Sequence, residues 1–210
     1  MIKVLIVDDH RIVREGIKKI IQMEADILAS GQAKDASEAI RIMSTTEIDV
    51  VILDVSLPGM SGLEAIKDLK ALNPKVRIIM LSMYPEERFA IRAIKAGASG
   101  YLTKETAPEE LVNSIRIVYS GRNYLTPFVT EKMVTELQSP AEKAHHEKLS
   151  AREFEVMCMI GSGKTLKEIA DILSLSTRTI STYRARVLTK MNLKNNAMIM
   201  HYMMDNWLLD

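Results

Sequence analysis

The chain has 210 residues, and its 28 lysines and arginines almost balance its 27 aspartates and glutamates. Hydrophobic residues make up 47% and charged residues 26%, with nine glycines and six prolines, which excludes collagen-like, low-complexity and disordered proteins. The single cysteine, Cys158, excludes an intramolecular disulfide and a multi-cysteine zinc site. No apolar run reaches the ~18 residues of a membrane span, and the start lacks a signal-peptide pattern, so we expect a cytoplasmic protein of one or two domains.

The first 120 residues alternate between strand-like and helix-like segments. Short runs rich in β-branched residues predict strands at about residues 2–7, 27–31, 49–53, 76–81 and 99–102. Apolar residues recur with the helical period at about residues 11–23, 36–43, 63–72, 86–96 and 109–119. Apolar strands joined by single helices predict a parallel sheet with helices on both faces. In such α/β sheets, ligands bind at the carboxyl ends of the strands.

Polar side chains follow four of the five expected strands. Asp8 and Asp9 follow the first strand, Asp54 the third, Ser82 the fourth and Lys104 the fifth. Three carboxylates held together repel one another unless a cation neutralises them, and Mg²⁺ prefers such oxygen ligands. A carboxylate beside Mg²⁺, a lysine and a hydroxyl group can attack a phosphoryl group. Asp54 is the best nucleophile because it stands alone at a central strand end.

Each of these residues also has an ordinary structural interpretation. Asp9 can cap the helix that starts near His10, Ser82 can be a turn residue, and Lys104 can be a surface charge. Their joint occurrence at matching strand ends favours a functional site.

The same residues lie in motifs that resemble the response-regulator receiver domain, over about residues 1–121. The motifs are VDDH at 7–10, LDVSLPGMSG at 53–62, LS at 81–82 and GASGYLTK at 97–104. The resemblance implies an α/β, flavodoxin-like fold, which is a doubly wound sheet of five parallel strands in the order 2-1-3-4-5.

The resemblance also implies a site chemistry. Asp54 would be the phosphoacceptor, with a phosphohistidine on a sensor histidine kinase as donor. Mg²⁺ would be the cofactor, bound by Asp8, Asp9, Asp54 and the backbone carbonyl of Ser56. Lys104 would support the phosphoryl group. Ser82 and Tyr101 would form a two-state switch, in which the hydroxyl moves to the phosphoryl group and the aromatic ring changes rotamer.

Residues 122–147 are expected to form a partly helical linker between two domains. The segment contains Pro127 and Pro140, carries net negative charge, and has a helix-like stretch at about 131–137. His145 and His146 are more often solvated linker residues than metal ligands when no third ligand is near.

Residues 148–210 predict a second, all-α domain of four short helices. Ser150 and Glu153 form a capping-box pattern at the start of the first helix. The second helix is expected at 166–173, the third at 177–191 after a three-residue turn, and the last from Asn195 or Asn196 to about Trp207. Two short helices joined by a tight turn are typical of a helix-turn-helix.

We expect the third helix of this domain to recognise DNA, because the excess of positive charge in the chain lies in the domain that contains it. Residues 1–128 hold 17 basic and 17 acidic side chains, whereas 148–210 hold nine and six, which leaves net +3. Ile180, Tyr183, Val187 and Met191 share the expected core face. We expect DNA contacts from Lys164, Lys167, Arg178, Thr179, Ser181, Thr182, Tyr183, Ala185, Arg186 and Lys190. An amphipathic bundle used only for protein contacts is the alternative.

The tail also resembles the LuxR-type helix-turn-helix domain. The motifs are LSARE at 149–153, KEIA at 167–170, LS at 175–176, TISTY at 179–183 and KMNL at 190–193. Together the two halves resemble NarL/FixJ-type two-component response regulators, and VYSG at 118–121 with STYRAR at 181–186 resembles the GacA/UvrY branch. Tyr183 replaces a histidine that is common in the family.

These observations predict a transcription factor that is controlled by phosphorylation. It would dimerise on phosphorylation and bind an inverted repeat in promoter DNA, with RNA polymerase as a further candidate partner. The final helix is rich in methionine (Met198, Met200, Met203, Met204), so part of it would be a dimer face, or else all of it packs into the core. Two other classes stay open: a phosphotransfer regulator without DNA binding, and a DNA-binding protein that ignores phosphate.

Overall fold

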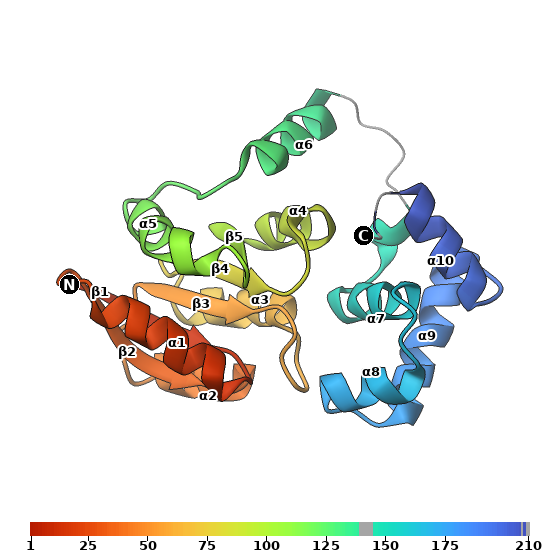
Figure 1. Ribbon diagram of the computed structural model, residues 1–210, viewed down its shortest axis with the longest axis horizontal. Coiled ribbons are helices and arrows are strands. Elements are labelled where there is room, and N and C mark those ends of the chain that lie inside the picture. Colours follow the sequence, from red (N-terminus) through yellow and green to blue (C-terminus); the bar gives the residue numbers. More distant parts are fainter. Residues whose placement is uncertain (139–144, 207, 209–210) are drawn as a thin grey trace. The chain divides into compact units, whose positions relative to one another are not determined.

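Five parallel strands form the centre of the first half of the chain (Figure 1). The computed structural model describes residues 1–138, 145–206 and 208. The strand order is β2-β1-β3-β4-β5, as expected for the flavodoxin-like fold. The strands are β1 (Ile2–Val7), β2 (Ile27–Ala33), β3 (Val50–Asp54), β4 (Arg77–Ser82) and β5 (Gly100–Thr103). All five were predicted to within two residues at each end.

Five helices cover the two faces of this sheet. One face carries α1 and α5, which contact each other, and the other carries α2, α3 and α4. Their bounds are α1 (Arg11–Gln22), α2 (Ala36–Met43), α3 (Gly62–Leu72), α4 (Glu86–Ala96) and α5 (Ala107–Tyr119). The last begins two residues earlier than expected, because Pro108 is tolerated in a first turn, where backbone N–H groups have no helical partner.

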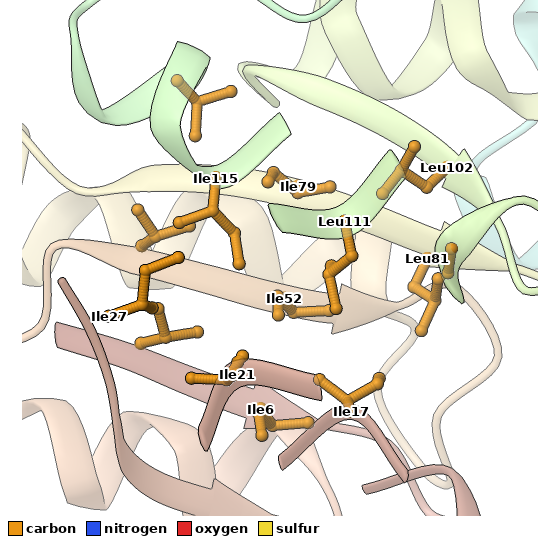
Figure 2. Close-up of a cluster of buried hydrophobic side chains, with 14 of the residues drawn as sticks. Ile6, Ile17, Ile21, Ile27, Ile52, Ile79, Leu81, Leu102, Leu111 and Ile115 are labelled. Atoms are coloured by element: carbon orange, nitrogen blue, oxygen red, sulfur yellow. The ribbon is translucent and has the colours of Figure 1, made fainter. Parts of the chain in front are cut away.

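A hydrophobic cluster fixes α1 and α5 against the sheet (Figure 2). Isoleucines from β1, β3 and β4 meet Ile17 and Ile21 of α1 and Leu111 and Ile115 of α5. Successive strand residues point to opposite faces, and Leu5 and Val7 of β1 and Val51 and Leu53 of β3 are also fully buried, against the other helix layer. A sheet buried on both faces holds the ends of its strands in fixed positions.

The segment after α5 continues along the sheet edge before helix α6 (Pro127–Gln138). Tyr124 forms an isolated parallel bridge to Gly100 of β5, and Val129 of α6 is buried. Contacts divide the chain into Met1–Met133 and Val134–Asp210, here called the receiver unit and the helical unit. Residues 122–133, which the sequence analysis assigned to the linker, therefore lie in the receiver unit.

The helical unit contains four α-helices after a short 3₁₀ helix, His145–Lys148. They are α7 (Ala151–Gly161), α8 (Leu166–Leu173), α9 (Thr177–Met191) and α10 (Asn196–Asp205), close to their predicted positions. Cap residues set these bounds: Ser150 and Thr165 form capping boxes, and Ser176 and Asn195 also accept bonds from the backbone of the first turn. Among the described residues, no helix is long and apolar enough to cross a membrane.

Candidate functional sites

The carboxyl edge of the receiver sheet brings the predicted polar residues together. Asp8 directly follows β1, Asp54 is the last residue of β3 and Ser82 the last of β4. The sheet hydrogen bonding continues past the strands, since the backbone N–H of Lys104 donates to the carbonyl of Ser82 at 2.7 Å. The backbone N–H of Asp8 donates to the Ala33 carbonyl at 3.1 Å. Backbone pairing therefore fixes where these side chains start.

Lys104 joins the two buried carboxylates of this edge. Its Nζ lies 2.7 Å from Asp8 Oδ2 and 2.7 Å from Asp54 Oδ2. Asp8 is 0% and Asp54 2% exposed, whereas Asp9 is only half-buried beside them. One ammonium group thus faces two carboxylates, which leaves an uncompensated negative charge in the site.

Burial controls the ionisation of this group of residues. It raises the pKa of Asp54 to about 7; Lys104 opposes this rise, and the carboxylate of Asp8 adds to it. Burial by itself would lower the pKa of Lys104, but the two carboxylates outweigh it and hold that pKa above its ordinary value. An added cation near Asp8 and Asp54 would oppose this rise in the Asp54 pKa, as Lys104 does.

The oxygen atoms of the site suit a hard divalent cation. Asp8, Asp9, His10 and Asp54 each offer one ligand atom, and these four atoms lie within 4.8 Å of one another. Asp8 Oδ2 and Asp9 Oδ1 are buried and accept no hydrogen bond of ordinary geometry, although Lys104 and His10 nitrogens lie 2.7 Å from them. Carboxylates with free lone pairs are the ligands that Mg²⁺ takes. The donor set therefore fits the predicted Mg²⁺.

His10 was not among the predicted site residues. Its backbone N–H donates to Asp8 Oδ1 at 2.8 Å, and its Nδ1 lies 2.7 Å from Asp9 Oδ1. Helix α1 starts after His10, which makes no side-chain cap bond. The alternative that Asp9 caps this helix is wrong, because the Asp9 side chain faces the His10 ring instead.

Two residues beyond Asp54 shape its surroundings. The backbone N–H of Ser56 donates to Asp54 Oδ1 at 3.2 Å, which places the Ser56 backbone beside the carboxylate. Gly62, which was not among the predicted site residues, is the first residue of α3. It lies so close to β3 that an added Cβ would lie 1.9 Å from the Asp54 carbonyl oxygen. Only glycine, which has no side chain, allows two backbone segments to approach so closely. The spacing of residues in the sequence does not reveal where such an approach occurs.

The two expected switch residues, Ser82 and Tyr101, bond to the same neighbour. The hydroxyl oxygen of Ser82 accepts from the Tyr84 backbone N–H at 2.9 Å, and the Tyr101 hydroxyl donates to the Tyr84 carbonyl at 2.8 Å. Ser82 and Tyr101 are both buried, and the Tyr84 ring stacks on Phe89 of α4 with centroids 4.9 Å apart. A change at Ser82 would therefore reach Tyr101 and α4 through Tyr84.

The surface of α9 presents most of the residues that were expected to contact DNA. Ile180, Val187 and Met191 are buried, and Tyr183 of the expected core face is half-buried. Thr179 is also half-buried and lies at the capped start of the helix. The exposed members of the predicted set are Lys164, Lys167, Arg178, Ser181, Thr182, Ala185, Arg186 and Lys190.

Ion pairs and hydrogen bonds tie the basic residues of α9 to neighbouring helices. Lys190 Nζ lies 2.6 Å from Oε2 of Glu153 in the capping box of α7. Although burial opposes it, Lys190 and the Ser150 backbone hold the pKa of Glu153 below its ordinary value. Arg184 Nε donates to Asn196 Oδ1 at 2.6 Å, which links α9 to α10. These two basic side chains therefore help to orient α9, and Arg186 is a freer cation on the exposed face.

His146 differs from its expected role as a solvated linker residue. It is half-buried, and its Nδ1 lies 2.9 Å from the Tyr202 hydroxyl of α10. Its ring also lies 5.8 Å from that of Phe154 in α7. The 3₁₀ helix at the start of the helical unit is thereby packed against two of the helices.

Comparison with known families and proteins identifies the domain in each half of the chain. Residues 4–116 match the response regulator receiver domain, and residues 147–203 match the luxR family of bacterial regulatory proteins. The chain is 37% identical over 202 residues to the response regulator UvrY of Escherichia coli K12, which covers 96% of this chain and 93% of that one. It is 34% identical to the response regulator GacA of Pseudomonas aeruginosa over 197 residues, covering 93% and 92%.

Solved structures of related proteins match all or part of the chain. RcsB of Salmonella enterica serovar Typhimurium, bound to promoter rprA in the presence of phosphomimetic BeF₃⁻, matches with a TM-score of 0.65 at 26% identity, over 97% of this chain and 99% of that one. A LuxR-family two-component response regulator from Aurantimonas matches with a TM-score of 0.59 at 36% identity, over 65% and 98%. The chain belongs to the two-component response regulators that join a receiver domain to a LuxR-type DNA-binding domain.

Proposed function

We propose that this protein is a transcription regulator whose DNA binding is controlled by phosphorylation of Asp54. The observation that carries the proposal is the pairing of Lys104 with both Asp8 and Asp54 at the carboxyl edge of the sheet. The proposal assigns residues 1–121 to the receiver domain, 122–147 to the linker, of which 122–133 lie in the receiver unit, and 148–210 to the DNA-binding domain. A protein that binds promoter DNA works in the compartment that holds the chromosome.

The position of the Asp54 carboxylate supports phosphoryl transfer to this residue. One carboxylate oxygen attacks the phosphorus of a phosphohistidine, and the P–N bond breaks with its electron pair returning to the imidazole, which takes up a proton. Lys104 is held where its ammonium can pair with an oxygen of the transferred group. Asp8, Asp9, Asp54 and the Ser56 carbonyl would hold Mg²⁺, which supplies positive charge to the phosphoryl oxygens when bound.

The Asp54 assignment predicts the result of a labelling experiment. Incubation with Mg²⁺ and a radiolabelled small-molecule phosphodonor such as acetyl phosphate should label the chain, and Asp54→Asn should reduce labelling to background because an amide oxygen is a poor nucleophile. Asp68→Asn, the same change at an exposed position of α3, should leave labelling unchanged. Labelling that persists in Asp54→Asn would disprove the assignment.

The switch step uses bonds that already exist in the receiver unit. In the phosphorylated state the Ser82 hydroxyl would donate to a phosphoryl oxygen instead of serving only as the acceptor for Tyr84. Charge-assisted hydrogen bonds are about twice as strong as neutral ones, so this exchange is favourable. Tyr84 and Tyr101 would then take new positions, and the protein would shift between two states.

We also propose that α9 lies in the major groove of DNA. Thr182 and Ala185 have short side chains that allow close approach to base edges, and Arg178 and Arg186 can reach guanine or phosphate. Lys164 and Lys167 stand before and within α8, where they can bind phosphates. RcsB, a structural relative, has been solved in complex with DNA.

The contribution of Arg186 is measurable as a salt effect. A plot of log binding constant against log salt concentration has a negative slope. The magnitude of this slope should become smaller by about one when Arg186 is replaced by alanine, if its guanidinium neutralises one phosphate. Arg41→Ala, which removes an exposed arginine of the receiver unit, should keep the wild-type slope. An affinity that does not depend on salt would contradict the proposed interface, as would equal slopes for wild type and Arg186→Ala.

Dimerisation on an inverted repeat is part of the proposal and depends on α10. Met203 is fully buried, whereas Met198, Met200 and Met204 are 39%, 40% and 64% exposed. The exposed methionines support a dimer face rather than core packing alone. A sensor histidine kinase is the proposed phosphodonor in the cell, and RNA polymerase is a proposed partner at the promoter.

A further inference from the structure

One hydroxyl group links the start of α4 to the start of α6. Thr126 Oγ1 donates to Oε2 of Glu86 at 2.6 Å, and Glu86 is the first residue of α4. The same oxygen accepts from the backbone N–H of Val129 at 3.3 Å, in the first turn of α6. Thr126 therefore acts as a helix cap for α6 while it holds a carboxylate of α4.

Glu86 lies two residues from Tyr84, the common partner of Ser82 and Tyr101. Pro85, the N-cap residue of α4, is the one residue between them and has an extended backbone, so the chain path from Tyr84 to Glu86 is short. The Tyr84–Phe89 stack ties the same tyrosine to the body of α4. Ser82 and Tyr101 both bond to Tyr84, and Glu86, whose carboxylate accepts the Thr126 hydrogen bond, is only two residues further along the chain.

The chain just before Thr126 is anchored separately to the sheet. The Tyr124 backbone N–H donates to the Ser99 carbonyl at 2.8 Å, and Tyr124 pairs with Gly100 at the edge of β5. Burial and the hydrogen-bonded Glu110 raise the pKa of the Tyr124 hydroxyl to about 12, which keeps it a neutral donor. Tyr124 is thus held at the sheet edge, and Thr126 is the first later residue whose side-chain bond depends on α4.

We infer that Thr126 couples the Ser82–Tyr101 switch to α6, the helix that leads along the chain toward the DNA-binding domain. This inference rests on the proposed function. In the unphosphorylated state, Glu86 holds the Thr126 hydroxyl and the capped turn of α6 stays packed on the receiver unit. When Ser82 and Tyr84 rearrange, Glu86 releases Thr126, and the first turn of α6 loses its attachment to α4. Tyr124 stays at the sheet edge in both states.

Hydrogen exchange of the full chain, measured by mass spectrometry with and without Mg²⁺ and BeF₃⁻, tests this coupling. In the wild type, BeF₃⁻ should increase exchange in peptides from the start of α6 by about fivefold, the effect expected from the loss of one hydrogen bond, that between Thr126 and Glu86. Thr126→Val, which lacks the hydroxyl, and Glu86→Ala, which leaves the cap residue in place, should remove this dependence on BeF₃⁻. Thr126→Ser keeps the hydroxyl and should respond as the wild type does.

The outcomes separate the coupling from the function on which it rests. If peptides that cover Ser82 to Glu86 respond to BeF₃⁻ while those of α6 do not, the coupling is wrong and the phosphorylation proposal stands. If Glu86→Ala and Thr126→Val keep the full wild-type response, the coupling is also wrong. If no part of the receiver unit responds and Asp54 is not labelled, both proposals fail. If Glu86→Ala and Thr126→Val lose the response of α6 to BeF₃⁻ while Thr126→Ser keeps it, the result supports the coupling.

Discussion

Replacing Gly62 with alanine should lower the free energy of unfolding of the receiver unit by about 3 kcal/mol, at the upper end of the usual cost of overpacking. The added Cβ would lie 1.9 Å from the Asp54 carbonyl oxygen and 2.9 Å from its carbonyl carbon. Both contacts are with backbone, which cannot turn aside as a side chain can. Relief therefore requires β3 and the start of α3 to move apart at Asp54 itself, and phosphodonor labelling of Asp54 should also fall. Urea denaturation followed by circular dichroism measures the loss of stability.

Gly16 provides the matched control for this substitution. It lies exposed within α1, and an added Cβ there would meet nothing within 4 Å. Gly16→Ala should therefore raise stability by roughly 0.5–1 kcal/mol, because alanine favours helix more than glycine does. If Gly62→Ala and Gly16→Ala have similar effects, the close approach of α3 to Asp54 does not constrain the site as described.

Magnesium should stabilise the receiver unit through the carboxylates at the sheet edge. A ligand that binds only the folded state adds about 2.7 kcal/mol when its concentration is 100 times its dissociation constant. The carboxylates of Asp8, Asp9 and Asp54 repel one another with only Lys104 between two of them, so the added cation relieves unfavourable charge as well as binding. The urea midpoint of the receiver transition should rise with Mg²⁺ and return when a chelator is added.

The carboxylate variants decide whether this stabilisation comes from the proposed site. Asp54→Asn removes one charged ligand and should abolish most of the magnesium-dependent shift, and Asp9→Asn should do the same. Asp68→Asn on α3 should keep the full shift, because that carboxylate is exposed on a helix. A shift of equal size in all four proteins would mean that Mg²⁺ binds elsewhere.

The residues at the carboxyl edge of the sheet could be predicted from the sequence because the apolar runs show where each strand ends. Apolar strands buried on both faces are continuous runs, and the first polar residue after each run marks the carboxyl end of the strand. Asp8, Asp54 and Ser82 each occupy such a position, and Lys104 follows Thr103 at the end of the fifth run, so parallel pairing had to bring them together. The turn and caps around α9 were predictable for a similar reason, since capping residues act on their nearest neighbours in the chain.

Contacts between residues far apart in sequence were not predictable in this way. Thr126 and Glu86 are 40 residues apart, and the pattern of either segment alone indicates only a helix start. The pairing of Lys190 with Glu153 depends on how α7 and α9 pack, and a count of charges treats that lysine as free to bind DNA. The need for glycine at position 62 comes from the short distance between the backbones of α3 and β3, and the sequence does not show that distance.

The placement of Lys104 has a consequence for the timing of a response. Because its ammonium pairs with both Asp8 and Asp54, a side chain of the protein itself holds the two carboxylates close together. Binding of a cation would then require no refolding of the strand ends. Under the proposed function, the time for which a signal persists after its stimulus ends would therefore depend on how fast the Asp54 acyl phosphate hydrolyses, and not on a change of fold at the strand ends.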